Sequence, residues 1–257
     1  MRIAYDLTVF ADFLEKQNLH TELVKLIRQR SACYSLENDI RSVTECLDRL
    51  DAIDAASPSD RVWVGQALMS CAVMMYCRAT IEDGNGRFAV GTTRDLNEDQ
   101  KKKQADIVAF RNRVIGHFGK ADGQYGEGWI NERLVFKPSE EGFGISGVCH
   151  RASFRSDLIA DLRELSAVVN NRVIELRKDR SKKLSILLMS LCADVHFIQL
   201  ISQYEFSPET FFPEADPEIF WESPLGASHE TRLKSGEIIV NPIEVYPETY
   251  PVNVSPL

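Results

Sequence analysis

The longest apolar pattern in this sequence runs from residue 156 to residue 201 and repeats every three or four residues. That spacing is the period of an α-helix, whereas a half-buried strand would alternate at every second position. The pattern predicts either one very long helix or two helices with a break near Asp179. Its apolar positions are Leu158, Ile159, Leu162, Leu165, Val168, Val169, Val173, Ile174, Leu176, Leu184, Leu187, Leu188, Leu191, Val195, Ile198 and Ile201.

Shorter patterns of the same kind fill most of the sequence before residue 118. Residues 5–56 predict two or three helices. Residues 60–82 predict a further helix, which is apolar almost all round from Ala67 to Met75 and is therefore expected to be buried at the centre of the fold. After a Gly-Asn-Gly turn, Thr93 to Asp95 are candidate caps for a further helix. The fold class that follows is mainly α.

Two features interrupt this helical plan. The segment 129–154 alternates like two strands around Pro138-Ser139-Glu140-Glu141-Gly142, which predicts an inserted β-hairpin. Residues 205–257, called the acidic arm below, hold eight of the ten prolines, ten acids and only two bases. They show no helical period, so we expect a helical domain over 1–204 and an extended arm that docks its aromatic residues on the helical body or on a partner.

Composition excludes several classes of protein. No segment approaches the roughly 18 apolar residues of a membrane span, and the first residues lack a signal-peptide core, so we expect a cytoplasmic location and no membrane partner. The six cysteines form no Cys-x-x-Cys pair and the histidines are scattered, so we expect neither a metal site nor a cofactor. Gly142 to Gly147 match Gly-x-Gly-x-x-Gly, but a strand-like run follows where a dinucleotide site needs a helix.

One stretch, residues 107–118, places a charged side chain where the pattern calls for an apolar one. Wound as an α-helix, it forms a broad apolar face with Arg111 in the middle and His117 on the flank. A buried arginine needs a partner, because it keeps its charge. Two readings stay open: a structural ion pair with Glu82 or Asp83, or a site that binds anions. The basic residues that surround it are Lys101, Lys102, Lys103, Arg113 and Lys120.

The run Phe-Arg-Asn-Arg-Val-Ile-Gly-His at residues 110–117 resembles the Arg-Asn-x4-His signature of the HEPN domain family, with Arg111, Asn112 and His117 at the matching positions. The resemblance extends to the buried helix before the motif and the helices after it, and covers roughly residues 36–200. It implies a helical bundle and metal-independent cleavage of RNA by these three residues, as in bacterial toxins and antiphage effectors. The hairpin and the acidic arm are departures from a minimal HEPN bundle.

The residue types suit that chemistry. A histidine with a pKa near ~6.5 can exchange a proton with a ribose 2′-hydroxyl or with the leaving 5′-oxygen. Arg111 can hold the phosphate as its negative charge grows, and Asn112 can donate a further hydrogen bond or orient the histidine. One motif supplies one histidine, so the resemblance implies a homodimer with a composite site, RNA as substrate and, for a toxin, an antitoxin protein. The alternative is a non-catalytic HEPN-like module that binds nucleotides or proteins.

Overall fold

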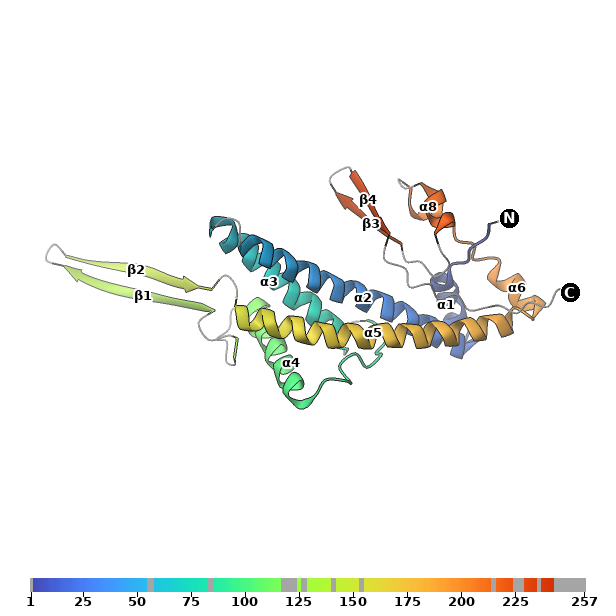
Figure 1. Ribbon diagram of the computed structural model, residues 1–257, viewed down its shortest axis with the longest axis horizontal. Coiled ribbons are helices and arrows are strands. Elements are labelled where there is room, and N and C mark those ends of the chain that lie inside the picture. Colours follow the sequence, from blue (N-terminus) through green and yellow to red (C-terminus); the bar gives the residue numbers. More distant parts are fainter. Residues whose placement is uncertain are drawn as a thin grey trace. The chain divides into compact units, whose positions relative to one another are not determined.

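The computed structural model describes residues 2–54, 58–82, 86–116, 124–125, 129–139, 142–152, 155–213, 216–223, 229–234 and 237–242 (Figure 1). The fold is mainly α with an inserted β-hairpin, as the sequence predicts. The helices are α1 (Leu7–Lys16), α2 (Thr21–Asp54), α3 (Pro58–Thr80), α4 (Glu98–Phe110), α5 (Ser156–Leu191), α6 (Val195–Ile201), α7 (Pro208–Phe211) and α8 (Pro217–Glu222), with a π-helical turn η1 (Arg111–Ile115). The strands are β1 (Ile130–Ser139), β2 (Gly142–Arg151), β3 (His229–Lys234) and β4 (Glu237–Pro242).

The chain divides into two compact units, and the long helices α2 and α5 contribute to both. Unit 1 comprises residues 1–27 and 181–257, and unit 2 comprises residues 28–180. The division expected from composition, between residues 204 and 205, falls inside unit 1. The helix α5 continues through Asp179, so the break considered there does not occur.

The core of unit 2 is formed by one face of each of α2, α4 and α5 around α3. The α3 helix contributes Met69, Val73 and Tyr76, each fully buried, which confirms the prediction of a core helix for this face. The helix is not buried all round, because Val62 and Trp63 near its N-terminal end are exposed. The α5 pattern is also confirmed, because residues three or four apart along it are fully buried. These α5 residues are Leu158, Leu162, Leu165, Val169 and Val173.

Unit 1 has its own smaller core, in which Phe10 of α1 packs against Phe197 and Tyr204. The start of the acidic arm is paired with the N-terminal segment, since the Phe206 N–H donates to the Ala4 carbonyl over 2.9 Å. In the described residues no single helix is long and apolar enough to cross a membrane. The bent pair α5 and α6, at 117°, meets the length and composition test only when taken together.

The acidic arm contains more regular structure than its sequence suggested. Two short helices, α7 and α8, begin at Pro208 and Pro217, each preceded by a side chain that caps the helix, Ser207 and Asp216. Helices of four and six residues are too short to show a period, so only the cap followed by proline could have revealed them. A second antiparallel hairpin, β3 and β4, was also not predicted.

The first hairpin matches the prediction closely. Strands β1 and β2 pair antiparallel in one unbroken register from Ile130 opposite Arg151 to Ser139 opposite Gly142. At its base, the Ala152 N–H donates to the Trp129 carbonyl over 2.9 Å.

The helix α4 begins later in the sequence than predicted. Asn97 caps the helix, not Thr93 to Asp95, and forms a capping box in which its side chain accepts from the Gln100 N–H over 2.9 Å. The Gln100 side chain in turn accepts from the Asn97 N–H over 3.1 Å. This reciprocal pair satisfies two backbone donors at once, which one threonine or aspartate cap does not.

Candidate anion-binding site at the end of α4

The motif arginine lies where the α-helical winding of α4 stops. Residues Arg111 to Ile115 form the π-helical turn η1, closed by a bond from the Gly116 N–H to the Arg111 carbonyl over 2.9 Å. A Cβ atom at position 116 would lie 3.3 Å from that same carbonyl, so glycine suits the close approach. Isolated π turns occur often at functional sites, and the regular helical winding assumed from sequence does not hold beyond Phe110.

Arg111 is half-buried and has an incomplete set of partners. Its Nη1 donates to the Asn112 Oδ1 over 2.7 Å, while its buried Nε has no hydrogen-bond partner. Within the described residues no carboxylate pairs with it. Its positive charge also acts on Cys77 of α3, where burial raises the thiol pKa to about 12 and Arg111 opposes that rise. A charged guanidinium is therefore held in place by an amide and carries no counter-ion among these residues.

The ion pair with Glu82 that the sequence left open is not formed. The Oε1 of Glu82 instead accepts the backbone N–H groups of Val90, Gly91 and Thr92 over 3.2, 2.6 and 3.0 Å. Gly91 has a φ of +76°, a conformation that favours glycine and lets successive N–H groups converge on one oxygen. Glu82 thus stabilises the loop before α4 rather than Arg111. The second residue considered as its partner, Asp83, lies outside the described residues, as do the predicted site residues His117 and Lys120.

The three lysines near the start of α4 differ in their surroundings. Lys101 pairs with Glu98 over 2.7 Å, and Lys102 is exposed. Lys103 pairs with Glu164 over 2.6 Å, with Asp161 over 3.0 Å and with Asp99 over 3.5 Å. Sequence proximity suggested one basic patch, but an α-helix rises 1.5 Å per residue, so Lys102 and Arg111 are separated by roughly 14 Å along the helix.

Asp161 and Glu164 of α5 are the site-related residues that sequence reasoning missed. The Tyr125 hydroxyl donates to Asp161 over 2.5 Å, and burial together with this bond raises the tyrosine pKa. Lys103, followed by Gln100, lowers the pKa of Glu164. Asp161 is nearly buried, and its place between Leu158 and Leu162 in an apolar pattern was the available signal that it has a partner inside the fold.

The C-terminal end of α4 packs against buried aromatic residues. Phe110, which immediately precedes Arg111, is 2% exposed and packs edge-to-face on Trp129 with ring centroids 5.0 Å apart. On the α3 side, Tyr76 donates to Gln104, whose amide donates to the Thr80 hydroxyl over 2.9 Å. The backbone that positions Arg111 is therefore fixed on two sides, while Asn112 and Arg113 are exposed.

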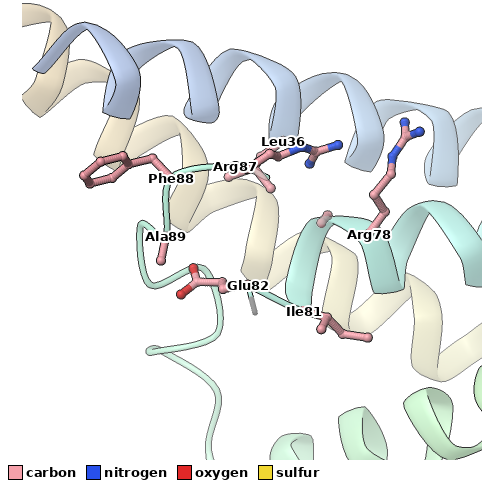
Figure 2. Close-up of a pocket in the computed structure, with 8 residues that line it drawn as sticks. Leu36, Arg78, Ile81, Glu82, Arg87, Phe88 and Ala89 are labelled. Carbon is pink, nitrogen blue, oxygen red and sulfur yellow. The ribbon is translucent and has the colours of Figure 1, made fainter. Parts of the chain in front are cut away.

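A small pocket elsewhere in unit 2 is lined by residues of α2, of α3 and of the segment after α3. Figure 2 shows Arg78 and Arg87 directed toward α2, and both pair there with the buried Asp39, Arg87 over 2.6 Å. The space open to a water-sized occupant is ≈ 10 Å³, about enough for one water molecule. The two arginines neutralise a buried carboxylate, so this pocket has a structural role. In the part of the chain that the structure describes, no cluster of three His, Cys, Asp or Glu residues is arranged to hold a metal ion.

Comparison with known proteins adds no relative, since no family model, curated protein or solved structure matches this chain.

Proposed function

We propose that this protein is a metal-independent endoribonuclease of the HEPN type, with Arg111, Asn112 and His117 as its catalytic residues. The observation that supports this most is the half-buried guanidinium of Arg111, which has no carboxylate partner among the described residues and an unused buried Nε–H. Burying a cation without a counter-ion is costly, so such a group is favoured where a ligand supplies the negative charge. A phosphodiester of RNA is a ligand of that kind.

In the proposed reaction the 2′-hydroxyl of the ribose attacks the adjacent phosphorus. A histidine removes the hydroxyl proton, the 5′-oxygen leaves with a proton returned to it, and the product carries a 2′,3′-cyclic phosphate. Arg111 stabilises the negative charge that builds on the non-bridging oxygens. Asn112 accepts from Arg111, so we assign it the role of positioning the guanidinium toward the phosphate.

The proposed enzyme acts as a homodimer, because proton removal and proton return need two groups and each motif supplies one histidine. Lys101, Lys102 and Arg113 are exposed and are proposed to contact the RNA backbone beyond the cleaved bond. Lys103 is a weaker candidate for that role, because three carboxylates compete for its ammonium group. As a biological setting we propose a toxin or antiphage effector in the cytoplasm, with an antitoxin protein as a partner.

The test is RNA cleavage in EDTA by the wild type, by His117→Ala and by Arg111→Ala, with Arg113→Ala as the matched control in the same turn. We expect cyclic-phosphate ends from the wild type. Each catalytic variant should lose at least about 100-fold in rate, the scale for removing one group that stabilises a transition state. Arg113→Ala should weaken RNA binding and leave the rate at saturating RNA unchanged.

Equal cleavage by the wild type and His117→Ala would contradict the assignment of the histidine, and loss of cleavage in EDTA would contradict the metal-free mechanism. Wild-type protein that binds RNA or nucleotides at Arg111 without cutting would favour the non-catalytic module instead.

A further inference from the structure

A second arginine of unit 2 is buried more deeply than Arg111. Arg177 of α5 is 6% exposed, and it is the one lysine or arginine that is buried in the described part of the chain. It directly follows Leu176, the last α5 residue of the unit 2 core. Because an arginine keeps its charge in such a place, it needs neighbours that supply negative charge and accept its hydrogen bonds.

The neighbours of Arg177 satisfy it only in part. The Oε2 of Glu37, on α2, lies 3.4 Å from its Nε, which is close enough for an ion pair. Neither this Nε nor the buried Nη2 of Arg177 has a hydrogen-bond partner. Each of the other described arginines with such a nitrogen has only one, as Arg172 does, so Arg177 is the least satisfied of them.

Two more guanidinium groups gather at the same place. Cys33 of α2 is fully buried, and burial raises the pKa of its thiol. The positive charges of Arg30, Arg180 and Arg177 all oppose that rise, so the three arginines lie around this thiol. We call them the arginine cluster. The Nε of Arg180 is also buried without a hydrogen-bond partner, although its Nη1 donates to Asp179 over 2.7 Å.

The arginine cluster has both the charge and the hydrogen-bond donors to hold an anion. Like charges gathered around one buried thiol repel each other, and an anion among them offsets that cost. Glu37 and Asp179 supply part of the negative charge but leave three buried nitrogens of Arg177 and Arg180 without an acceptor. The side chain of Arg180 is 22% exposed, so the cluster is not closed off from solvent.

We infer that the arginine cluster binds a phosphate dianion, either inorganic phosphate or the terminal phosphate of a nucleotide. Guanidinium groups match phosphate, because two parallel N–H bonds can reach two of its oxygens. A terminal phosphate carries about 1.5 to 2 negative charges and three free oxygens, so it can accept from more than one arginine. A backbone phosphate of RNA fits less well, because its chain continues on both sides and Arg177 is only 6% exposed.

The arginine cluster is separate from the candidate site at the end of α4. Along α5, Arg177 lies beyond Arg172, which pairs over 3.7 Å with Asp95 in the segment before α4. Arg111 follows the opposite, C-terminal end of that helix. The inference therefore goes beyond the proposed function, because phosphate binding by the cluster involves neither RNA nor its cleavage.

The experiment is isothermal titration calorimetry of the full chain with inorganic phosphate, at an ionic strength held constant with sodium chloride. Arg177→Met removes the guanidinium and keeps an unbranched apolar side chain. Arg172→Met is the matched control, because it is the same change on the same helix at an arginine with one unpartnered nitrogen. We expect Arg177→Met to raise the dissociation constant at least about tenfold, as for the loss of a charge-assisted hydrogen bond, and Arg172→Met to leave it unchanged.

A second variant, Arg180→Met, keeps the test decisive if Arg177→Met does not fold. The side chain of Arg180 is partly exposed, so its replacement should be tolerated, and it should also weaken phosphate binding. Circular dichroism checks that each variant is folded. Adenosine monophosphate that binds more tightly than phosphate identifies a nucleotide as the ligand, and the reverse order identifies inorganic phosphate.

The inference is overturned if the wild type shows no saturable binding of phosphate, if Arg172→Met and Arg177→Met lose binding equally, or if Arg180→Met binds as the wild type does. The same titration of Arg111→Ala separates the two sites. Binding that depends on Arg177 should persist in this variant, and its loss would contradict a separate site. Competition by an RNA without terminal phosphates would also overturn the inference. No measurement here uses cleavage, so its outcome is distinct from that of the proposed nuclease activity.

Discussion

Basic residues stand at both ends of α4 in the sequence, but their surroundings differ in the structure. At the N-terminal end, Lys101 and Lys103 are paired with carboxylates, and Lys103 alone contacts three of them. At the C-terminal end, Arg111 contacts an amide and has no carboxylate partner among the described residues. Whether a basic side chain is available to a ligand therefore depends on whether the fold places a carboxylate beside it. A count of basic residues in a window cannot supply that information.

The largest effect on stability is expected at the paired end of the helix. Asp161→Ala removes the acceptor of the Tyr125 hydroxyl and one partner of Lys103 in a nearly buried position. We expect the free energy of unfolding to fall by about 2–3 kcal/mol, measured by urea denaturation. Asp161→Asn keeps an acceptor for Tyr125 and should cost less. The cleavage rate per folded molecule should stay at the wild-type value in both variants. A lowered rate per folded molecule would show that the N-terminal end of α4 also contributes to cleavage, which would contradict this account.

A smaller effect concerns Glu164 and its dependence on pH. Lys103 lowers the pKa of this carboxyl from its ordinary value of 4.5, so the folded state favours the charged form. The stabilisation is therefore present above pH 4.5 and is lost as the pH falls through the lower, folded-state pKa. Glu164 is partly exposed, so we expect Glu164→Gln to cost only about 0.5 kcal/mol at pH 7 and progressively less as the pH falls through the folded-state pKa. A cost that stays constant across this range in paired urea titrations would show that the charge is not its cause.

The helices were predictable from sequence because their apolar residues recur with the helical period over several turns. Leu158, Leu162 and Leu165 illustrate this, as they are fully buried on one face of α5. The hairpin was predictable for the same reason, since its strands alternate around a turn-forming segment. The short helix α7 was not, because one turn contains no period and depends on the Ser207 cap.

The arrangement of the candidate site could be predicted only in part. The motif identified Arg111 and Asn112, and the structure shows them hydrogen-bonded to each other. The partners of Lys103 could not be found from local sequence, because Asp161 and Glu164 lie about sixty residues away and reach it only when α4 packs beside α5. The π turn could not be predicted either, because the sequence was interpreted with a regular α-helical period, which does not show where the hydrogen-bond pattern changes.

The central claim is that Arg111 binds the phosphate of RNA through a guanidinium that has no internal counter-ion. Nitrogen-15 NMR of the arginine side chains tests it most directly, with the Nε–H resonance of Arg111 assigned by its absence in Arg111→Lys. Titration with a 2′-O-methylated RNA, which cannot be cleaved by 2′-hydroxyl attack, should move this resonance saturably and more than that of Arg113. An Arg111 resonance that stays fixed while the protein becomes saturated with RNA would contradict the account.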